Sequence, residues 1–325
     1  MNPVLKICFA ISLTWVASPP LLSQENAAPS CFVPFVLRNA QGELIHNIAA
    51  ADLSLKVGGN AAAISQVFRE RRPRRIVMVL DASGSMSGLD NSLTWRRALA
   101  SAKLLNALAE GRAQIALIIF NSKVVEQIGF NQGTPVVAQR LEGLEKGDQS
   151  QPIKVYGPTA LYDAIGRAIE ILDKPTSADV IYLIGDAGEN ASHLSRSKLM
   201  SLVDQSGVRI FANLLQPNVG PRNRSRASGK DAENLLELTQ STGGDIFQIA
   251  STQFHWSFQS PPDLPVEKGL QLFLAAIFEN DVIEFPSSSL RPGKRDVAVS
   301  IADERKSGLP KSQLSYPHQL NSCVQ

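Results

Sequence analysis

Five strand-like segments rich in apolar residues recur along the middle of the chain, at residues 76–80, 115–120, 180–184, 208–214 and 245–249, and the first three are unbroken apolar runs. Runs of this length without alternation are typical of strands buried on both faces. Apolar residues at helical spacing follow them, at 92–109, 135–144, 160–172, 195–205, 231–241 and 267–278. Because buried strands alternate with helices of ten or more residues, the pattern predicts an α/β fold with a doubly wound, mostly parallel sheet.

Both ends of the chain have a different pattern, with short strand-like segments between proline and glycine breaks. They predict one small β subdomain built from both chain ends and packed against the α/β domain. The expected organisation is a signal peptide at 1–24, an N-terminal β segment at 25–70, the α/β domain at 71–279 and a C-terminal β segment at 280–325. The basic run at 69–75 is interpreted as a solvated linker, with a protease-cut site or a patch for an anionic partner as alternatives.

The first residues have the pattern of a cleaved secretory signal. Lys6 precedes an apolar run at 7–17 that is too short to span a bilayer, and small residues and prolines follow it. A buried helix or a membrane anchor is the alternative. No later segment offers about 18 consecutive apolar residues, so no transmembrane segment is expected after signal removal. The mature protein is therefore predicted to be secreted or periplasmic.

The cysteines agree with export. Cys8 lies in the predicted signal, which leaves Cys31 and Cys323, one near each end of the mature chain. In an oxidising compartment such a pair is expected to form a disulfide that ties the two β segments together. Two free thiols, or lipidation of Cys31, are the alternatives, since sequence alone does not supply the geometry.

Composition narrows the class of protein. With 44% apolar and 19% charged residues among 325, the chain can bury a core, which excludes disorder as its main state. Its 32 basic and 30 acidic residues give a net charge of only +2. Nucleic acid is not expected as a partner, because its recognition needs a concentrated positive field.

Candidate chemistry begins where the first buried strand ends, in the turn Asp81-Ala82-Ser83-Gly84-Ser85. This turn lies at the carboxyl edge of the predicted sheet, where ligands bind in such folds. One carboxylate and two hydroxyls at alternate positions can converge on one point. They are hard oxygen donors, which suit Mg²⁺. Thr159, near the start of a helix, and Asp186, after another buried strand, are expected to add donors from two further loops.

At these residues the chain resembles the von Willebrand factor type A family. That family's metal-ion-dependent adhesion site uses a D-x-S-x-S turn, a threonine and an aspartate from three loops, and residues 81, 83, 85, 159 and 186 match in type and order. The resemblance covers about residues 75–250 and is closest to bacterial secreted VWFA-related proteins, to whose D-x-x-G-x-x-I-like segment residues 39–45 are a loose match. It implies metal ligation by Asp81, Ser83, Ser85, Thr159 and Asp186, with Mg²⁺ as the ion and Mn²⁺ or Ca²⁺ as alternatives.

The chain departs from the family pattern around its last aspartate. The family often has threonine or serine before it and glycine after it, where this chain has Gly185 and Ala187. The aspartate itself remains, so the departure concerns the tuning of the site more than metal binding.

The resemblance implies a non-enzymatic, adhesion-type binding module, in which a carboxylate of a protein or surface ligand completes the coordination of the ion. Rim candidates are Glu189 and three arginines of the loop after the fourth run, Arg222, Arg224 and Arg226. The arginines would favour an acidic ligand and raise its association rate, although a solvated loop explains them as well.

Several catalytic signatures are absent from the sequence, so no catalytic residue is assigned. There is no G-x-S-x-G elbow, no G-x-x-x-x-G-K-[ST] phosphate loop and no H-E-x-x-H zinc motif. Two alternatives to the binding module are kept. One is a metal-assisted hydrolase that uses the Asp81 and Asp186 pocket, and the other is a structural scaffold whose metal stabilises the fold.

Overall fold

The computed structural model describes residues 29–39, 41–87, 93–148, 150, 152–215, 230–250, 253–256, 266–290, 295–302, 313–320 and 323–324. The predicted signal peptide at 1–24 lies outside these residues, as do Arg222, Arg224 and Arg226 of the predicted rim. The described helices include none that is long and apolar enough to cross a membrane.

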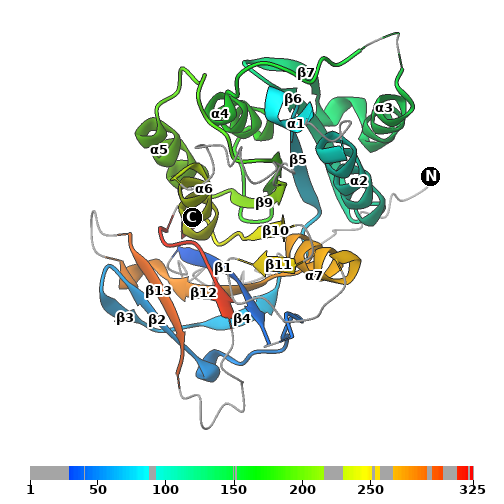
Figure 1. The fold of residues 1–325 in the computed structure, drawn as a ribbon. Coiled ribbons are helices and arrows are strands. Elements are labelled where there is room, and N and C mark those ends of the chain that lie inside the picture. Colours follow the sequence, from blue (N-terminus) through cyan, green and yellow to red (C-terminus); the bar gives the residue numbers. More distant parts are fainter. Residues whose placement is uncertain are drawn as a thin grey trace, which may run out of the picture.

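The main sheet has seven strands in the order β11-β10-β9-β8-β5-β6-β7 (Figure 1). The strands are β5 (Arg74–Asp81), β6 (Ala113–Phe120), β7 (Val124–Ile128), β8 (Val180–Gly185), β9 (Arg209–Leu215), β10 (Ile246–Ala250) and β11 (Gln253–Trp256). The central five are parallel, which confirms the predicted doubly wound sheet. The antiparallel edge strands β7 and β11 were not predicted, because they are short.

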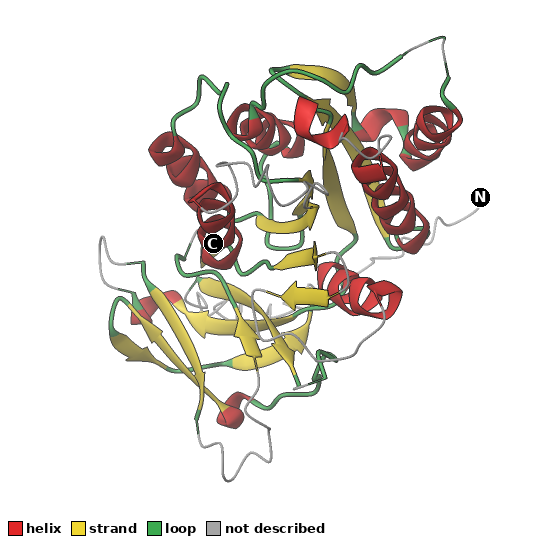
Figure 2. Cartoon of the chain, in the orientation of Figure 1, coloured by secondary structure: helices red, strands yellow, loops and turns green. Residues whose placement is uncertain are grey.

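Helices cover both faces of this sheet (Figure 2). They are α1 (Gly84–Ser87), α2 (Leu93–Leu108), α3 (Thr134–Lys146), α4 (Leu161–Leu172), α5 (Arg196–Ser206), α6 (Lys230–Ser241) and α7 (Val266–Phe278). Along β5, Ile76, Met78 and Leu80 pack with α2, α3 and α7, while Val77 and Val79 pack with α4, α5 and α6. Burial on both faces explains why these strands read as continuous apolar runs.

The two chain ends form the predicted β subdomain below the main sheet (Figure 1). One of its sheets has the order β14-β1-β12-β4 with β15 also paired to β1, and the other has the order β13-β2-β3. The strands are β1 (Ser30–Arg38), β2 (Leu53–Val57), β3 (Asn60–Ala62), β4 (Gln66–Arg69), β12 (Asp281–Pro286), β13 (Val297–Ile301), β14 (Gln313–Ser315) and β15 (Cys323–Val324). The short 3-10 helices are η1 (Ala50–Asp52), η2 (Phe130–Gln132) and η3 (Ser287–Ser289). N-terminal and C-terminal strands share one apolar core, so neither end forms a subdomain alone.

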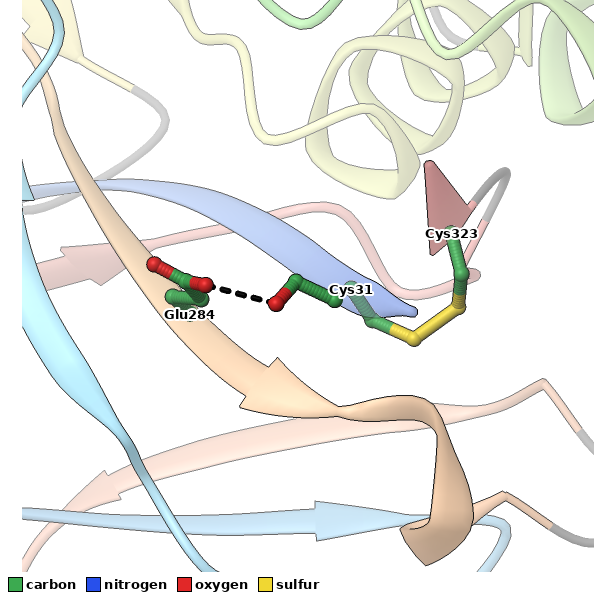
Figure 3. The surroundings of a disulfide bond; sticks show 4 residues. Cys31, Glu284 and Cys323 are labelled. Carbon is green, nitrogen blue, oxygen red and sulfur yellow. Dashed lines mark hydrogen bonds between the residues drawn. A yellow bond between two sulfur atoms is a disulfide. The ribbon is translucent and has the colours of Figure 1, made fainter. Parts of the chain in front are cut away.

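A disulfide joins Cys31 to Cys323, across a sequence separation of 292 residues (Figure 3). It fixes the two-residue strand β15 to the start of β1, where Ser30 Oγ donates a hydrogen bond of 2.6 Å to Glu284 of β12. The predicted pairing is confirmed, and the alternatives of free thiols or a lipidated Cys31 are wrong.

The basic run at 69–75 is not the solvated linker that the sequence suggested. Arg74 is buried, and its guanidinium donates hydrogen bonds to the carbonyl oxygen of Phe278 at the end of α7 and to Asn280 Oδ1. Glu70 is buried and accepts hydrogen bonds from Arg72. Arg75 pairs with Asp179. The run therefore helps to join the β subdomain to the α/β domain.

Candidate metal centre

The D-x-S-x-S turn lies at the carboxyl end of β5, as predicted. The Ala82 amide donates to Phe120 of β6, and the Ser83 amide donates to Asp81 Oδ1 at 2.7 Å, which fixes the carboxylate against the turn. Ser83 Oγ and Ser85 Oγ lie 3.1 Å apart. Neighbouring ligands of an octahedral Mg²⁺ lie about 3 Å apart, given bonds of about 2.1 Å at right angles. The two hydroxyls are therefore spaced as adjacent ligands of such an ion.

Backbone hydrogen bonds tie the three predicted loops together. The Tyr156 amide donates to the Ala82 carbonyl at 3.0 Å, and the Gly84 amide donates to the Gly157 carbonyl at 2.9 Å. These bonds place the segment before Thr159 directly beside the D-x-S-x-S turn. The carbonyl oxygen of Thr159 in turn accepts hydrogen bonds from two amides of the loop after Asp186, those of residues 190 and 191, at 3.0 Å each.

Thr159 and Asp186 point toward a common region. A Cβ placed on Gly188 would lie 3.2 Å from Asp186 Oδ1 and 3.4 Å from Thr159 Oγ1, so these two oxygens flank one position. The Thr159 amide donates to Asn190 Oδ1 at 2.8 Å. Asn190 was not singled out in the sequence, since a lone asparagine after a strand gives no signal of its own.

Acidic groups of the site are buried close to one another. Asp81 is only 2% exposed. Its burial, together with the charge of the Asp186 carboxylate, raises the pKa of Asp81 to about 7. Burial and the charges of Glu189 and Asp186 also raise the pKa of Asp231, which begins α6. A positive ion among these groups would relieve both the burial of Asp81 and the mutual repulsion.

The departures around Asp186 have structural consequences. A Cβ on Gly185 would lie 2.8 Å from Asp81 Cβ, so the buried carboxylate occupies the space that a serine or threonine would need. Ala187 is buried and has a φ of 68°, in the left-handed region. That conformation costs a residue other than glycine about 1–2 kcal/mol. Strain of this kind is typical of functional loops whose surroundings determine their shape.

Substitution of Gly185 by alanine is expected to destabilise the fold and displace Asp81. The added methyl cannot fit without moving the Asp81 side chain or strand β8, and overpacking of this kind costs about 1–3 kcal/mol. Urea unfolding measures the loss. The matched control is Gly143→Ala in α3, where the new Cβ meets only the Asp148 side chain at 3.4 Å and helix propensity improves. Equal stability of the two variants would contradict this account of Gly185.

The donor set fits a hard divalent cation. It comprises two carboxylates and three hydroxyls, from Asp81, Asp186, Ser83, Ser85 and Thr159, all at one edge of the sheet. Within the described ranges no three His, Cys, Asp or Glu side chains cluster closely enough to hold a metal. A site here would therefore depend on hydroxyl ligands, and assignment of the five residues as ligands stays a prediction.

Of the residues predicted to surround the metal site and contact a ligand, only Glu189 lies among the described residues. Both oxygens of Glu189 accept hydrogen bonds: Oε2 accepts from the Tyr162 amide and the Ser192 hydroxyl, and Oε1 accepts from the amides of Ala191 and Ser192. These bonds tie Glu189 to its own loop and to the start of α4, and a ligand contact by Glu189 stays a prediction. Tyr156, which the sequence analysis missed, is 62% exposed directly beside the turn and is a better rim candidate.

Comparison with known proteins supports the resemblance. Residues 76–189 match the family model described as von Willebrand factor type A domain, a range that includes all five predicted ligands. No curated protein matches the chain.

Three solved structures illustrate its structural similarities. An aerotolerance-related membrane protein from Bacteroides fragilis NCTC 9343 is 15% identical, with a TM-score of 0.41, over 63% of this chain and 98% of that one. BatB from Bacteroides thetaiotaomicron is 12% identical, with a TM-score of 0.42 and the same two coverages. The vWF domain of the type V pili tip protein Mfa5 from Porphyromonas gingivalis is 22% identical, with a TM-score of 0.29, over 36% of this chain and 38% of that one.

Proposed function

We propose that this protein is a divalent-metal-dependent binding module that recognises an acidic group of a protein ligand, since residues 76–189 match the family model described as von Willebrand factor type A domain. The observation that supports the proposal is that three loops at one edge of the sheet, which carry Asp81, Ser83, Ser85, Thr159 and Asp186, are joined by hydrogen bonds. Mg²⁺ is the proposed ion, because every donor in the set is a hard oxygen.

In the proposed site, Ser83, Ser85 and Thr159 would hold the ion through their hydroxyls, and Asp81 and Asp186 would supply the negative charge. The bound ion supplies a coordination position that a carboxylate oxygen from a partner can take. The proposed ligand set includes two carboxylates, those of Asp81 and Asp186, whose charges would balance that of a divalent ion without exceeding it, so a partner's carboxylate could still approach. Recognition of this kind makes and breaks no covalent bond.

We also propose that the protein works outside the cytoplasm, secreted or in the periplasm. The disulfide between Cys31 and Cys323 supports this, because such bonds persist in oxidising compartments. The apolar run at 7–17 gives the matching export signal. Tyr156, exposed beside the metal turn, would contact the ligand next to its acidic group.

Calorimetric titration of the chelator-treated protein with Mg²⁺ tests the proposal. We expect saturable binding at one site, which Ser85→Ala weakens more than about tenfold by removal of a ligand hydroxyl. Ser87→Ala is the matched control, because it lies in the same short helix α1 but its hydroxyl donates to the Gly84 carbonyl at 2.7 Å. It should bind Mg²⁺ as the unmodified protein does.

The same titration in millimolar acetate separates the binding module from the two alternatives. Acetate should bind only when Mg²⁺ is present, since it completes the coordination of the ion. Mg²⁺ binding without any acetate response would favour the structural scaffold. Mg²⁺-dependent turnover of an ester or phosphate substrate would favour the metal-assisted hydrolase. If neither ion nor acetate binds, the proposed function is wrong.

A further inference from the structure

A cavity of about 640 Å³ lies between the β subdomain and the α/β domain, beside the segment that precedes β5, whereas the metal turn lies at the other end of that strand. Its floor is the face of the sheet β14-β1-β12-β4 that carries Phe32, Pro34 and Phe68. Its opposite wall comes from the turns after α4 and α5, at Pro175–Ser177 and Ser206–Gly207. We refer to this cavity as the junction groove.

The floor of the junction groove is apolar and partly uncovered. Phe32 and Phe68 lie edge to face with their ring centroids 6.4 Å apart, and Phe68 remains 36% exposed. Val33, between Phe32 and Pro34 on β1, belongs to the core on the other face of this sheet. The sheet therefore has one face packed inside the β subdomain and a second face that is only partly covered by the α/β domain.

Nearly all polar side chains around the junction groove already have partners. Arg72 binds Glu70 and the Ser177 hydroxyl, and Arg69 binds Asp281. Three more side chains each make a hydrogen bond: Thr176 Oγ1 accepts from the Ala178 amide, Ser206 Oγ donates to the Val203 carbonyl, and Gln319 Nε2 donates to Asp296 Oδ1. These groups have little hydrogen-bonding capacity left for a ligand.

Arg71 is the exception. It lines the junction groove, is exposed, and makes no ion pair or side-chain hydrogen bond with any residue that the structure describes. The three other arginines of the basic run that lie at this junction, Arg69, Arg72 and Arg74, are each held by acidic or carbonyl groups. The groove therefore presents an apolar floor, polar side chains that are mostly engaged elsewhere, and the guanidinium of Arg71.

We propose that the junction groove binds a single-chain amphiphile with an anionic head, of the fatty-acid type. Its apolar chain would cover Phe32, Pro34 and Phe68, and its carboxylate would pair with Arg71. A cavity of this volume falls in the range of small-molecule sites, which are mostly apolar with a few polar groups that orient the ligand.

The small number of free hydrogen-bonding groups in the junction groove makes an extended peptide an unfavourable occupant. The floor is the face of a sheet, and the backbone groups that pair β1, β12 and β4 lie in the plane of that sheet, so they do not point into the groove. A buried peptide would bring its own amides and carbonyls, and each one without a partner costs free energy. An alkyl chain carries no such groups, so an apolar floor with one cation beside it suits an alkyl chain better than a peptide.

Calorimetric titration of the full mature chain with dodecanoate, below its micellar concentration, tests this proposal. We expect one saturable site. Arg71→Gln should weaken it at least about tenfold, because a charge-assisted hydrogen bond is lost, while Arg71→Lys should keep most of the affinity. Phe68→Ser should also weaken binding, whereas Val136→Ser, which removes an exposed apolar side chain of α3 outside the groove, should not.

Two control ligands test whether binding needs both the negative charge and the alkyl chain of dodecanoate. Dodecyltrimethylammonium has the same chain with the opposite charge and should bind far more weakly than dodecanoate, and acetate without a chain should not bind at this site. Absence of saturable dodecanoate binding, equal binding of the cationic amphiphile, or an Arg71→Gln variant with unchanged affinity would each overturn the proposal. Asp81→Asn should leave dodecanoate binding intact, so the result does not depend on the metal site.

Discussion

Replacement of Asp81 by asparagine is expected to stabilise the metal-free protein at pH 8 and to abolish its response to Mg²⁺. In the folded chain, burial and the neighbouring Asp186 raise the pKa of Asp81 from 3.8 to about 7. Ionisation of this carboxylate at pH 8 therefore costs the folded state as much as about 4 kcal/mol. Asparagine keeps the shape and still accepts the Ser83 amide at Oδ1, but it carries no charge.

The sign of the pH dependence follows from this raised pKa. Between about pH 4 and pH 7 the folded protein holds a proton on Asp81 that the unfolded chain has released, so the metal-free protein loses stability as the pH rises through this window. The Asp81→Asn variant lacks this dependence. Its advantage in urea unfolding with a chelator should be about 2–3 kcal/mol greater at pH 8 than at pH 5.

A second buried carboxylate gives the matched control. Asp179 is buried as deeply as Asp81, but Arg75 donates to both of its oxygens, at 3.0 and 2.6 Å. Asp179→Asn should therefore lower stability at pH 8, because it breaks an ion pair. If Asp81→Asn also lowers stability at pH 8, or still responds to Mg²⁺, Asp81 is not the uncompensated charge of the site.

The sequence predicted the parts of the fold that depend on burial. Strand β8 reads as an unbroken apolar run because α2 and α4 cover its two faces, and unbroken or nearly unbroken apolar segments predicted all five central strands. Strand β7 was missed because Val124–Ile128 at the edge of the sheet alternates between exposed and covered positions and is too short to stand out. Arg74 was misread because a buried arginine that caps a helix has the same sequence signal as an exposed one.

The candidate metal centre was predictable for a different reason. Asp81, Thr159 and Asp186 each follow or precede a regular element, so the parallel sheet fixes them at one edge. The contacts between the loops were not predictable. Gly185 looked like a departure from a pattern, whereas the structure shows that Asp81 fills the space beside it. Close packing of this kind depends on the distance between two strands, which no single segment encodes.

Removal of the disulfide is expected to lower the stability of the protein against urea strongly. Because Cys31 and Cys323 are 292 residues apart, their bond restricts the unfolded chain strongly, which corresponds to about 6 kcal/mol in the loop-entropy model. In the folded protein, the described part of β15 has only two residues and pairs with β1. Cys31→Ala with Cys323→Ala should therefore unfold at a much lower urea concentration, and reduction should destabilise the unmodified protein to a similar extent.

The same pair of measurements distinguishes an effect on the unfolded chain from an effect on the native packing. Cys31 is fully buried in the core of the β subdomain, so its replacement also removes apolar contacts. The loss of these contacts is expected to lower the free energy of unfolding by about 1–2 kcal/mol. Reduction removes the bond and leaves the side chain in place. A loss that appears on substitution but not on reduction would mean that packing of Cys31 dominates. An equal loss in both would mean that the bond stabilises the protein by restricting the unfolded chain, whose two ends it joins across nearly the whole described sequence.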